Sequence, residues 1–259
     1  MFEFASKQRV KNAQYRGFTL AEVLITLGII GVVAAMTLPT LISNYQKSVA
    51  LNRLKQTYAQ IMVGIEAVAA EQDMLPMHQW KCTETWDSGK FNYIQESCFY
   101  LVFEKLGAKM HGRSPENMDQ VMCYGETPYR AYTQMNGNTG DIPTSGKWLS
   151  TYSWSATMPN GACVVWMAYA WTGDARGSMI IDIDGPYAGP NRYGKDTFRF
   201  LYVAANSGAG LGSNGLNIYP VSYTSTNRNN LKNNCKSSGS ACAALIWQDG
   251  WQMKPDYPW

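Results

Sequence analysis

Residues 16–39 read RGFTLAEVLITLGIIGVVAAMTLP, and this stretch decides how the chain folds. From Phe18 to Leu38 the only charged residue is Glu22, and Pro39 follows the apolar run. As an α-helix, such a run spans about 31 Å, which matches a bilayer hydrocarbon core of about 30 Å. The sequence therefore predicts a helix over residues 18–39 that crosses a membrane once.

The segment before this helix, residues 1–17, is polar and basic. Its net charge of +3 equals the net charge of the whole chain, and the next basic residue is Lys47. Since basic flanks stay on the cytoplasmic side, we expect a cytoplasmic N-terminus with the bulk of the chain outside. The remaining chain is neutral, so its composition gives no general electrostatic reason to bind nucleic acid.

Residues 40–72 change from apolar to amphipathic. Apolar side chains such as Leu51, Leu54 and Tyr58 recur at three- and four-residue steps, with polar residues between them. Pro39 alone would kink the helix without ending it. One helix over residues 18–72 would reach about 80 Å, far more than one globular domain needs, so half of it needs an environment other than water.

Residues 73–259 are rich in Trp, Tyr, Gly, Asn and Ser, and contain all six cysteines. This confinement suggests disulfides formed outside the cytoplasm, with buried thiols or a metal site as alternatives. We predict an α+β protein: a long N-terminal helix followed by a disulfide-bonded, mainly antiparallel β head. The expected strands are 163–171, 178–183, 197–204 and 241–247, a short helix is expected over 94–106, and 208–240 reads as loop.

Two interpretations of the N-terminal segment compete. A secretory signal would be cut after Val33-Ala34-Ala35 and would release a soluble protein. However, the apolar run is long for a signal, and an acid inside a membrane costs about 3 kcal/mol at mid-depth, so Glu22 calls for a reason. Both features favour a helix that stays in the membrane.

The residues around Gly17 resemble the N-terminal cleavage and methylation motif of type IV pilins and type II secretion pseudopilins. A basic leader ends at Gly17, Phe18 follows, and Glu22 and Pro39 are the fifth and twenty-second residues after the expected cut. The resemblance implies that a prepilin peptidase cuts between Gly17 and Phe18 and methylates the Phe18 amine. It is closest over residues 16–45 and weaker to residue 72.

This resemblance implies a structural subunit of a type IV pilus or a type II secretion pseudopilus, polymerised through its N-terminal helix. Such a subunit waits in the bacterial inner membrane with its head in the periplasm or outside. Inner-membrane assembly machinery then adds it to an extracytoplasmic filament of identical or related subunits. There Glu22 can pair with a neighbour's Phe18 amine, since a paired charge costs much less in low dielectric than an unpaired one.

An alternative function is that of a minor pilin whose head binds a ligand, as an adhesin or a DNA-uptake module. The many aromatic residues of the head could serve such a surface or could fill its core. The chain has no nucleophile elbow, no phosphate-binding glycine loop and no paired histidines. We therefore expect that the chain is not an enzyme.

One head segment carries a candidate metal site, although no cofactor is certain. Residues 181–196 read as a strand that enters a Gly/Pro-rich loop bearing Asp182, Asp184, Asn191 and Asp196. Oxygen ligands that converge at a turn suit calcium, and the segment looks like loops that hold calcium in some pseudopilins. The alternative is a β-turn with capping aspartates. Both interpretations stay open.

Cys235 and Cys242 enclose a short, flexible stretch that a disulfide closes easily, and many pilins resemble this chain in stapling a C-terminal loop. We favour this pair for that reason. The pairings 82–98 and 123–163 rest on proximity in the sequence alone. The aromatic tail, residues 247–259, is expected to pack back on the head or to meet a partner.

Overall fold

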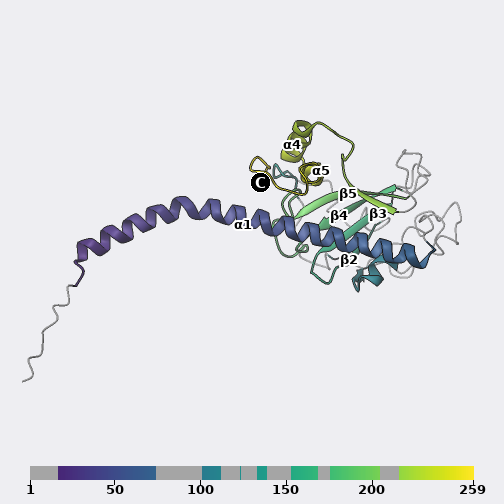
Figure 1. Cartoon of the computed structure of the whole chain (residues 1–259), viewed down its shortest axis with the longest axis horizontal. Coiled ribbons are helices and arrows are strands. Elements are labelled where there is room, and N and C mark those ends of the chain that lie inside the picture. Colours follow the sequence, from purple (N-terminus) through teal and green to yellow (C-terminus); the bar gives the residue numbers. More distant parts are fainter. Residues whose placement is uncertain are drawn as a thin grey trace, which may run out of the picture. The chain divides into compact units, whose positions relative to one another are not determined.

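The computed structural model describes residues 17–73, 101–111, 123, 133–138, 153–168, 176–204 and 216–259. The chain divides into two compact units, residues 1–45 and 46–259. Helix α1, Leu20–Glu71, begins in the first unit and ends in the second, and Pro39 lies inside it (Figure 1). The predicted long N-terminal helix is confirmed.

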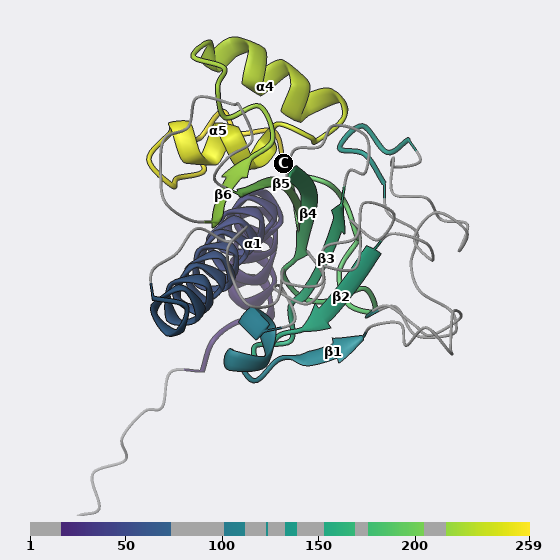
Figure 2. The same ribbon diagram turned by 90° about the vertical axis from the view of Figure 1, so that its right-hand side faces the viewer.

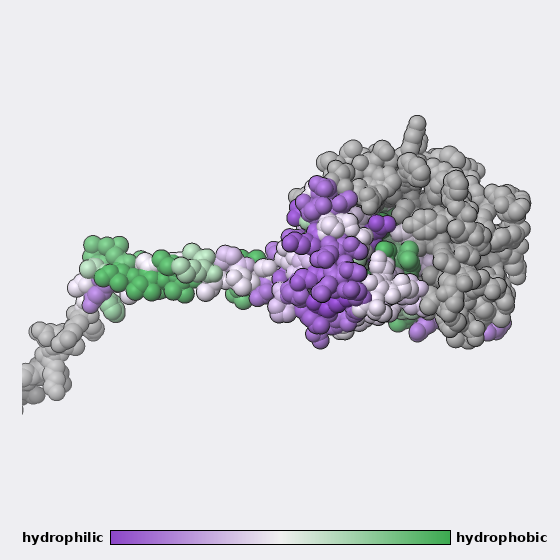
Figure 3. Space-filling model, turned by 90° about the horizontal axis from the view of Figure 1, so that it is seen from above, coloured by the Kyte–Doolittle hydropathy of each residue, from purple (hydrophilic) through white to green (hydrophobic). Residues whose placement is uncertain are grey.

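The first unit exposes apolar side chains all around the helix. Phe18, Leu24 and Ile30 are 87%, 60% and 63% exposed, and Figure 3 shows this part of α1 in the colours of hydrophobic residues. Among the described residues, α1 alone is long and apolar enough to span a membrane, judged by length and composition. A helix that is apolar on every side needs lipid or other helices around it.

The second unit is built on one antiparallel sheet whose strands follow one another in chain order (Figure 2). Each strand pairs with the next, as predicted for a mainly antiparallel head. The strands are β1 (Lys109–His111), β2 (Ser153–Thr157), β3 (Cys163–Ala168), β4 (Arg176–Asp182), β5 (Thr197–Ala204) and β6 (Leu216–Pro220).

The later part of α1 supplies one side of the hydrophobic core. Leu54 and Ile61 are fully buried in one cluster with sheet residues such as Phe198. Tyr58 of α1 stacks on Phe200 of β5 at 5.6 Å and donates a hydrogen bond to the Ile218 carbonyl of β6 at 2.9 Å. The amphipathic pattern expected over residues 40–72 therefore has its physical reason in this packing.

Two expectations for the C-terminal region are wrong. Residues 241–247, expected as a strand, form most of helix α5, Cys242–Gln248, which lies against β5 and β6. A continuous apolar run cannot distinguish a buried helix from a buried strand, and alanine favours the helix. Within the expected loop 208–240 lie β6 and helix α4, Arg228–Ser237, whose N-cap Asn227 accepts a hydrogen bond from the Asn230 N–H at 3.1 Å.

The short helix expected over residues 94–106 is only partly within the described chain. Residues 101–105 are helical, and residues 94–100 lie outside the described residues. Phe103 of this segment stacks on Trp166 of β3 with ring centroids 4.6 Å apart. The segment thus completes the core on the side of β3.

Candidate functional site

A reciprocal cap fixes where α1 begins. The Glu22 Oε2 atom accepts hydrogen bonds from the N–H and the hydroxyl of Thr19, both at 2.8 Å. Thr19 Oγ1 accepts the Glu22 N–H at 3.2 Å. This capping box satisfies amide groups that a helix start leaves without partners. Glu22 therefore has polar contacts within its own chain.

Gly17 and Phe18 lie just before this cap and outside the helix. Phe18 is 87% exposed, and no described atom lies within 4 Å of where a Cβ on Gly17 would sit. Pro39 lies inside α1, which continues on both sides of it although the proline lacks an N–H donor. The predicted cleavage and assembly residues thus share one exposed segment.

Two of the four candidate calcium ligands hold the head loop together. Asp182 Oδ1 accepts the Gly185 N–H at 3.0 Å. Asp196 accepts the N–H groups of Asn191 and Arg192 at 2.8 and 2.6 Å. These contacts are those of capping aspartates, so Asp182 and Asp196 fit the turn interpretation.

Asp184 meets Asp196 at Gly189. Oxygen atoms of both carboxylates line the space that a Cβ on Gly189 would fill, the nearest of Asp184 being 2.9 Å from it. Asp184 Oδ1 is buried and accepts no hydrogen bond from the described residues. Burial, and then the Asp184 carboxylate, raise the pKa of Asp196 to about 6, while backbone N–H donors oppose this rise. Burial also raises the pKa of Asp184.

This pair of acids is a partial fit to a calcium site. The ligands are oxygens, and one of them accepts no hydrogen bond within the described part of the chain. The two negative charges also repel each other, and a cation would relieve both conditions. In the described chain, no three His, Cys, Asp or Glu residues gather where a metal could bind them together. A calcium ion here would therefore rely on Asp184 and Asp196 together with neutral oxygens.

Two disulfides link described residues of the head. Cys235 of α4 is bonded to Cys242 of α5, with Cα atoms 4.5 Å apart, and Cys123 is bonded to Cys163 of β3, with Cα atoms 5.9 Å apart. These are two of the pairs expected from the sequence. Cys82 and Cys98 lie outside the described residues. Both described disulfides tie together segments of the second unit.

The N-terminal segment gives the decisive comparison. Residues 12–38 match a family model described as the prokaryotic N-terminal methylation motif. The chain carries the type IV pilin/pseudopilin signature. Residues 161–259 match a second model, described as a family of unknown function (DUF6613). No curated protein and no solved structure matches the chain significantly. The signature implies processing by a prepilin peptidase and assembly as a pilin.

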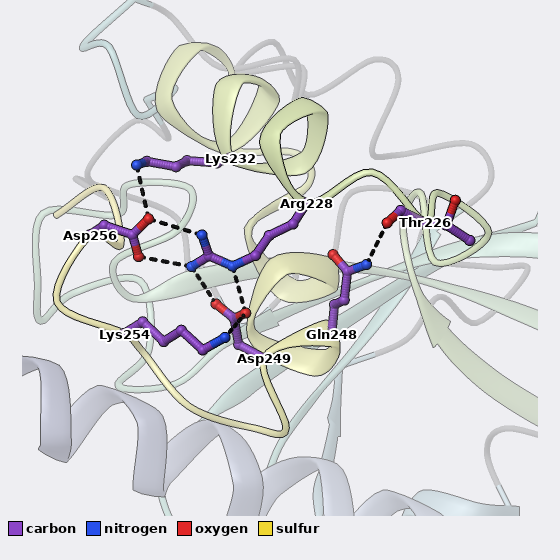
Figure 4. Close-up of polar contacts among 7 residues, drawn as sticks. All are labelled: Thr226, Arg228, Lys232, Gln248, Asp249, Lys254 and Asp256. Carbon is purple, nitrogen blue, oxygen red and sulfur yellow. Dashed lines mark hydrogen bonds and ion pairs between the residues drawn. The ribbon is translucent and has the colours of Figure 1, made fainter.

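The pilin-like chain also has an ion-pair network that the sequence did not suggest (Figure 4). Arg228 donates to both Asp249 oxygens at 2.7 Å and to both Asp256 oxygens at 2.9 and 2.8 Å. Lys232 forms an ion pair with Asp256 at 2.9 Å, and Lys254 forms one with Asp249 at 2.8 Å. The Asp249 side chain is 1% exposed. The network ties α4 to the segment after α5.

The C-terminal tail of this pilin-like head packs back on the head. Tyr257 is buried and donates a hydrogen bond to the Gly194 carbonyl at 2.6 Å. The Lys195 ammonium lies 5.4 Å from the centre of the Trp259 ring. Of the two expectations for residues 247–259, packing on the head describes these contacts.

Proposed function

We propose that this chain is a structural subunit of a type IV pilus or type II secretion pseudopilus, polymerised through α1 after a prepilin peptidase has cut it. The observation that carries this proposal is the methylation motif on residues 12–38, which opens a helix with an exposed apolar surface. Lipid covers that surface in the free subunit, and neighbouring helices cover it in the filament. The head stays outside the cytoplasm, where its disulfides persist.

In this proposal, Glu22 sets the register in which neighbouring subunits pack in the filament. The cut after Gly17 removes the basic leader and leaves a cationic amine on Phe18. Before assembly, the Thr19 hydrogen bonds lower the cost of holding the Glu22 charge at membrane depth. In the filament, the amine of a neighbouring subunit supplies an opposite charge, and this pairing sets one helix beside the next.

Intact-mass analysis of the membrane-extracted protein tests the processing step. We expect a chain that lacks residues 1–17 and carries one added methyl group. A Gly17→Val variant should accumulate as the full-length precursor, because a branched side chain next to the cut bond blocks the peptidase. Gly28→Val, within the apolar run, is the matched control and should be cut normally. A mature chain that begins near Met36 and is released from the membrane would overturn the assignment.

A structural role is favoured here over a ligand-binding or catalytic head. Among the described residues, several aromatic rings stack on one another: Tyr219 on Tyr223 at 4.6 Å and on Trp247 at 5.9 Å, and Trp247 on Trp251 at 6.0 Å. Ring faces used in this way are not free to stack on a sugar or a base. We infer on the same grounds that the head acts by its shape and its packing.

We propose, as a second property of the head, that Asp184 and Asp196 bind calcium together with neutral oxygens. The support is the buried Asp184 Oδ1, which none of the described residues hydrogen-bonds, and the repulsion between two carboxylates at Gly189. Calcium would supply positive charge to this loop and so replace repulsion with attraction. Asp182 keeps its role as the cap of the turn.

An Asp184→Asn variant should change the stability of the head in opposite directions without and with calcium. The folded pKa of Asp196 lies above the ordinary value of 3.8, so its contribution to stability is complete below pH 3.8 and is lost as pH rises through about 6. Removal of the neighbouring charge should therefore raise the unfolding free energy at pH 7 in chelator by roughly 1 kcal/mol.

With calcium present, the wild-type head should gain stability and Asp184→Asn should not. Urea unfolding followed by tryptophan fluorescence, in chelator and in calcium, measures both effects. Glu66→Gln, which changes an exposed acid on α1, is the control and should behave as the wild type. A wild-type head that unfolds identically in both buffers would exclude the calcium site.

A further inference from the structure

The C-terminal segment of the chain, residues 249–259, lies against the loop that carries the candidate calcium ligands. Tyr257 of this segment is buried, and its hydroxyl donates a hydrogen bond to the Gly194 carbonyl at 2.6 Å. Asp196 follows Gly194 by two residues, and backbone N–H groups hold its carboxylate inside the same loop. We name residues 249–259 the C-terminal latch.

The turn around Gly194 fixes the position of the Asp196 carboxylate. The Gly194 N–H donates to the Thr197 carbonyl at 2.8 Å, and the Asp196 N–H donates to the Arg192 carbonyl at 3.3 Å. The Asp196 carboxylate in turn accepts the Arg192 N–H at 2.6 Å and the Thr197 hydroxyl at 3.2 Å. A shift of Gly194 would therefore move the groups that orient this carboxylate.

The disulfide between Cys235 and Cys242 also contacts this turn. A Cβ on Gly194 would meet the Cys242 sulfur, and a Cβ on Gly239, between the two cysteines, would meet Tyr193. The backbone of the turn is thus packed on the disulfide loop with no space for an added side chain. The turn therefore has two sets of contacts, one with the disulfide loop and one with the latch.

The latch is itself held by the ion pairs that Arg228 of α4 forms (Figure 4). Asp249 and Asp256 both belong to the latch, and both accept hydrogen bonds from the Arg228 guanidinium. Asp256 directly precedes Tyr257 in the chain. The contacts of the latch with α4 therefore continue directly into its contact with Gly194.

We propose that the C-terminal latch sets the calcium affinity of the site at Asp184 and Asp196, an inference that rests on the calcium site proposed above. The Tyr257 hydroxyl holds Gly194, and the turn around Gly194 holds the Asp196 carboxylate beside that of Asp184. A site whose ligands are already in place binds more tightly, because binding does not have to order them. By linkage, calcium strengthens the docking of the latch on the head by the same factor.

Calorimetric titration of the full chain in detergent micelles with calcium tests this inference. Tyr257→Phe removes the hydroxyl that contacts Gly194 but keeps the ring, and it should weaken calcium binding about threefold, within what one net hydrogen bond contributes. Tyr58→Phe is the matched control, because it also removes a hydroxyl that donates to a backbone carbonyl, that of Ile218. It should lower the stability of the head without changing the calcium affinity.

Two further measurements extend the test. Gly194→Ala should weaken calcium binding more than Tyr257→Phe, because the disulfide sulfur and the φ of +85° at Gly194 both exclude a Cβ. Hydrogen exchange gives the reciprocal effect: the Tyr257 N–H, which donates to the Lys254 carbonyl at 2.9 Å, should exchange more slowly when calcium is added. In Asp184→Asn, calcium should not slow this exchange.

The outcomes distinguish the latch from the calcium site itself. Equal calcium affinities of the wild type and Tyr257→Phe would overturn the inference and leave the calcium site intact. An equal loss of affinity in Tyr58→Phe would also overturn it, since the affinity would then follow the general stability of the head. A wild-type chain in which calcium produces neither heat nor slower exchange would overturn the proposed calcium site, and the inference with it.

Discussion

Replacing Glu22 with glutamine should leave the subunit cut and in the membrane but almost absent from filaments. Glutamine keeps the shape of the side chain and still caps the helix with Thr19, so only the negative charge is lost. The amine of the neighbouring subunit would then lie in low dielectric without an opposite charge, which costs about 3–5 kcal/mol. We expect the amount of subunit in the sheared filament fraction to fall by about a hundredfold or more.

The controls for this prediction separate the charge from the cap. Glu22→Leu removes both and should also fail to assemble. Glu66→Gln removes an exposed charge from the later part of α1 and should assemble as the wild type. Immunoblots of sheared filaments and of membranes measure the two pools. Normal filaments of Glu22→Gln would show that the cap, and not the charge, is what assembly needs.

Replacing Arg228 with methionine should cause the largest loss of head stability among the surface substitutions considered. Methionine retains most of the apolar stem but leaves the Asp249 carboxylate, 1% exposed, with Lys254 as its remaining cation. Because Lys254 still pairs with Asp249, the expected cost is that of lost hydrogen bonds to a charged group, about 1.5–3 kcal/mol. Lys236→Met, on the same helix and exposed, should have little effect. Urea unfolding of the oxidised protein compares the two variants.

The pH dependence gives a second measure of the same network. The Arg228 hydrogen bonds hold the pKa of Asp249 below its ordinary value, so their contribution to stability is present above pH 3.8 and is lost as pH falls further. Arg228→Met should therefore be closest to the wild type at acidic pH and furthest from it at neutral pH. If the unfolding free energies of the two proteins differed by the same amount at acidic and at neutral pH, the ion-pair explanation would be contradicted.

The N-terminal part of α1 could be predicted because the pattern that specifies it lies within one short stretch of sequence. An apolar run of membrane length, one acid near its start and a glycine before it are all visible within residues 16–39. The strand Thr197–Ala204 was predicted with its observed bounds for a similar reason, since five of its eight residues are β-branched or aromatic.

The C-terminal half was harder because its structure depends on distant partners. Helix α4 has only Leu231 and Cys235 buried, and its polar residues resemble those of a loop until Asn227 caps it. The acids that pair with Arg228 lie 21 and 28 residues further along the chain, beyond the reach of any sequence pattern. Likewise, the sequence did not show that Asp182 and Asp196 would accept backbone N–H groups. Nor did it show that Asp184 Oδ1 would accept none from the described residues.

Helix α1 has a mechanical consequence for any filament built from this subunit. In the proposed filament, lipid or neighbouring helices surround the first part of α1, and the later part of the same helix supplies Leu54 and Ile61 to the interior of the head. A pull on α1 would thus act on a helix whose later side chains are packed inside the head. To leave the head under such a load, α1 would have to draw Leu54 and Ile61 out of the core of the second unit.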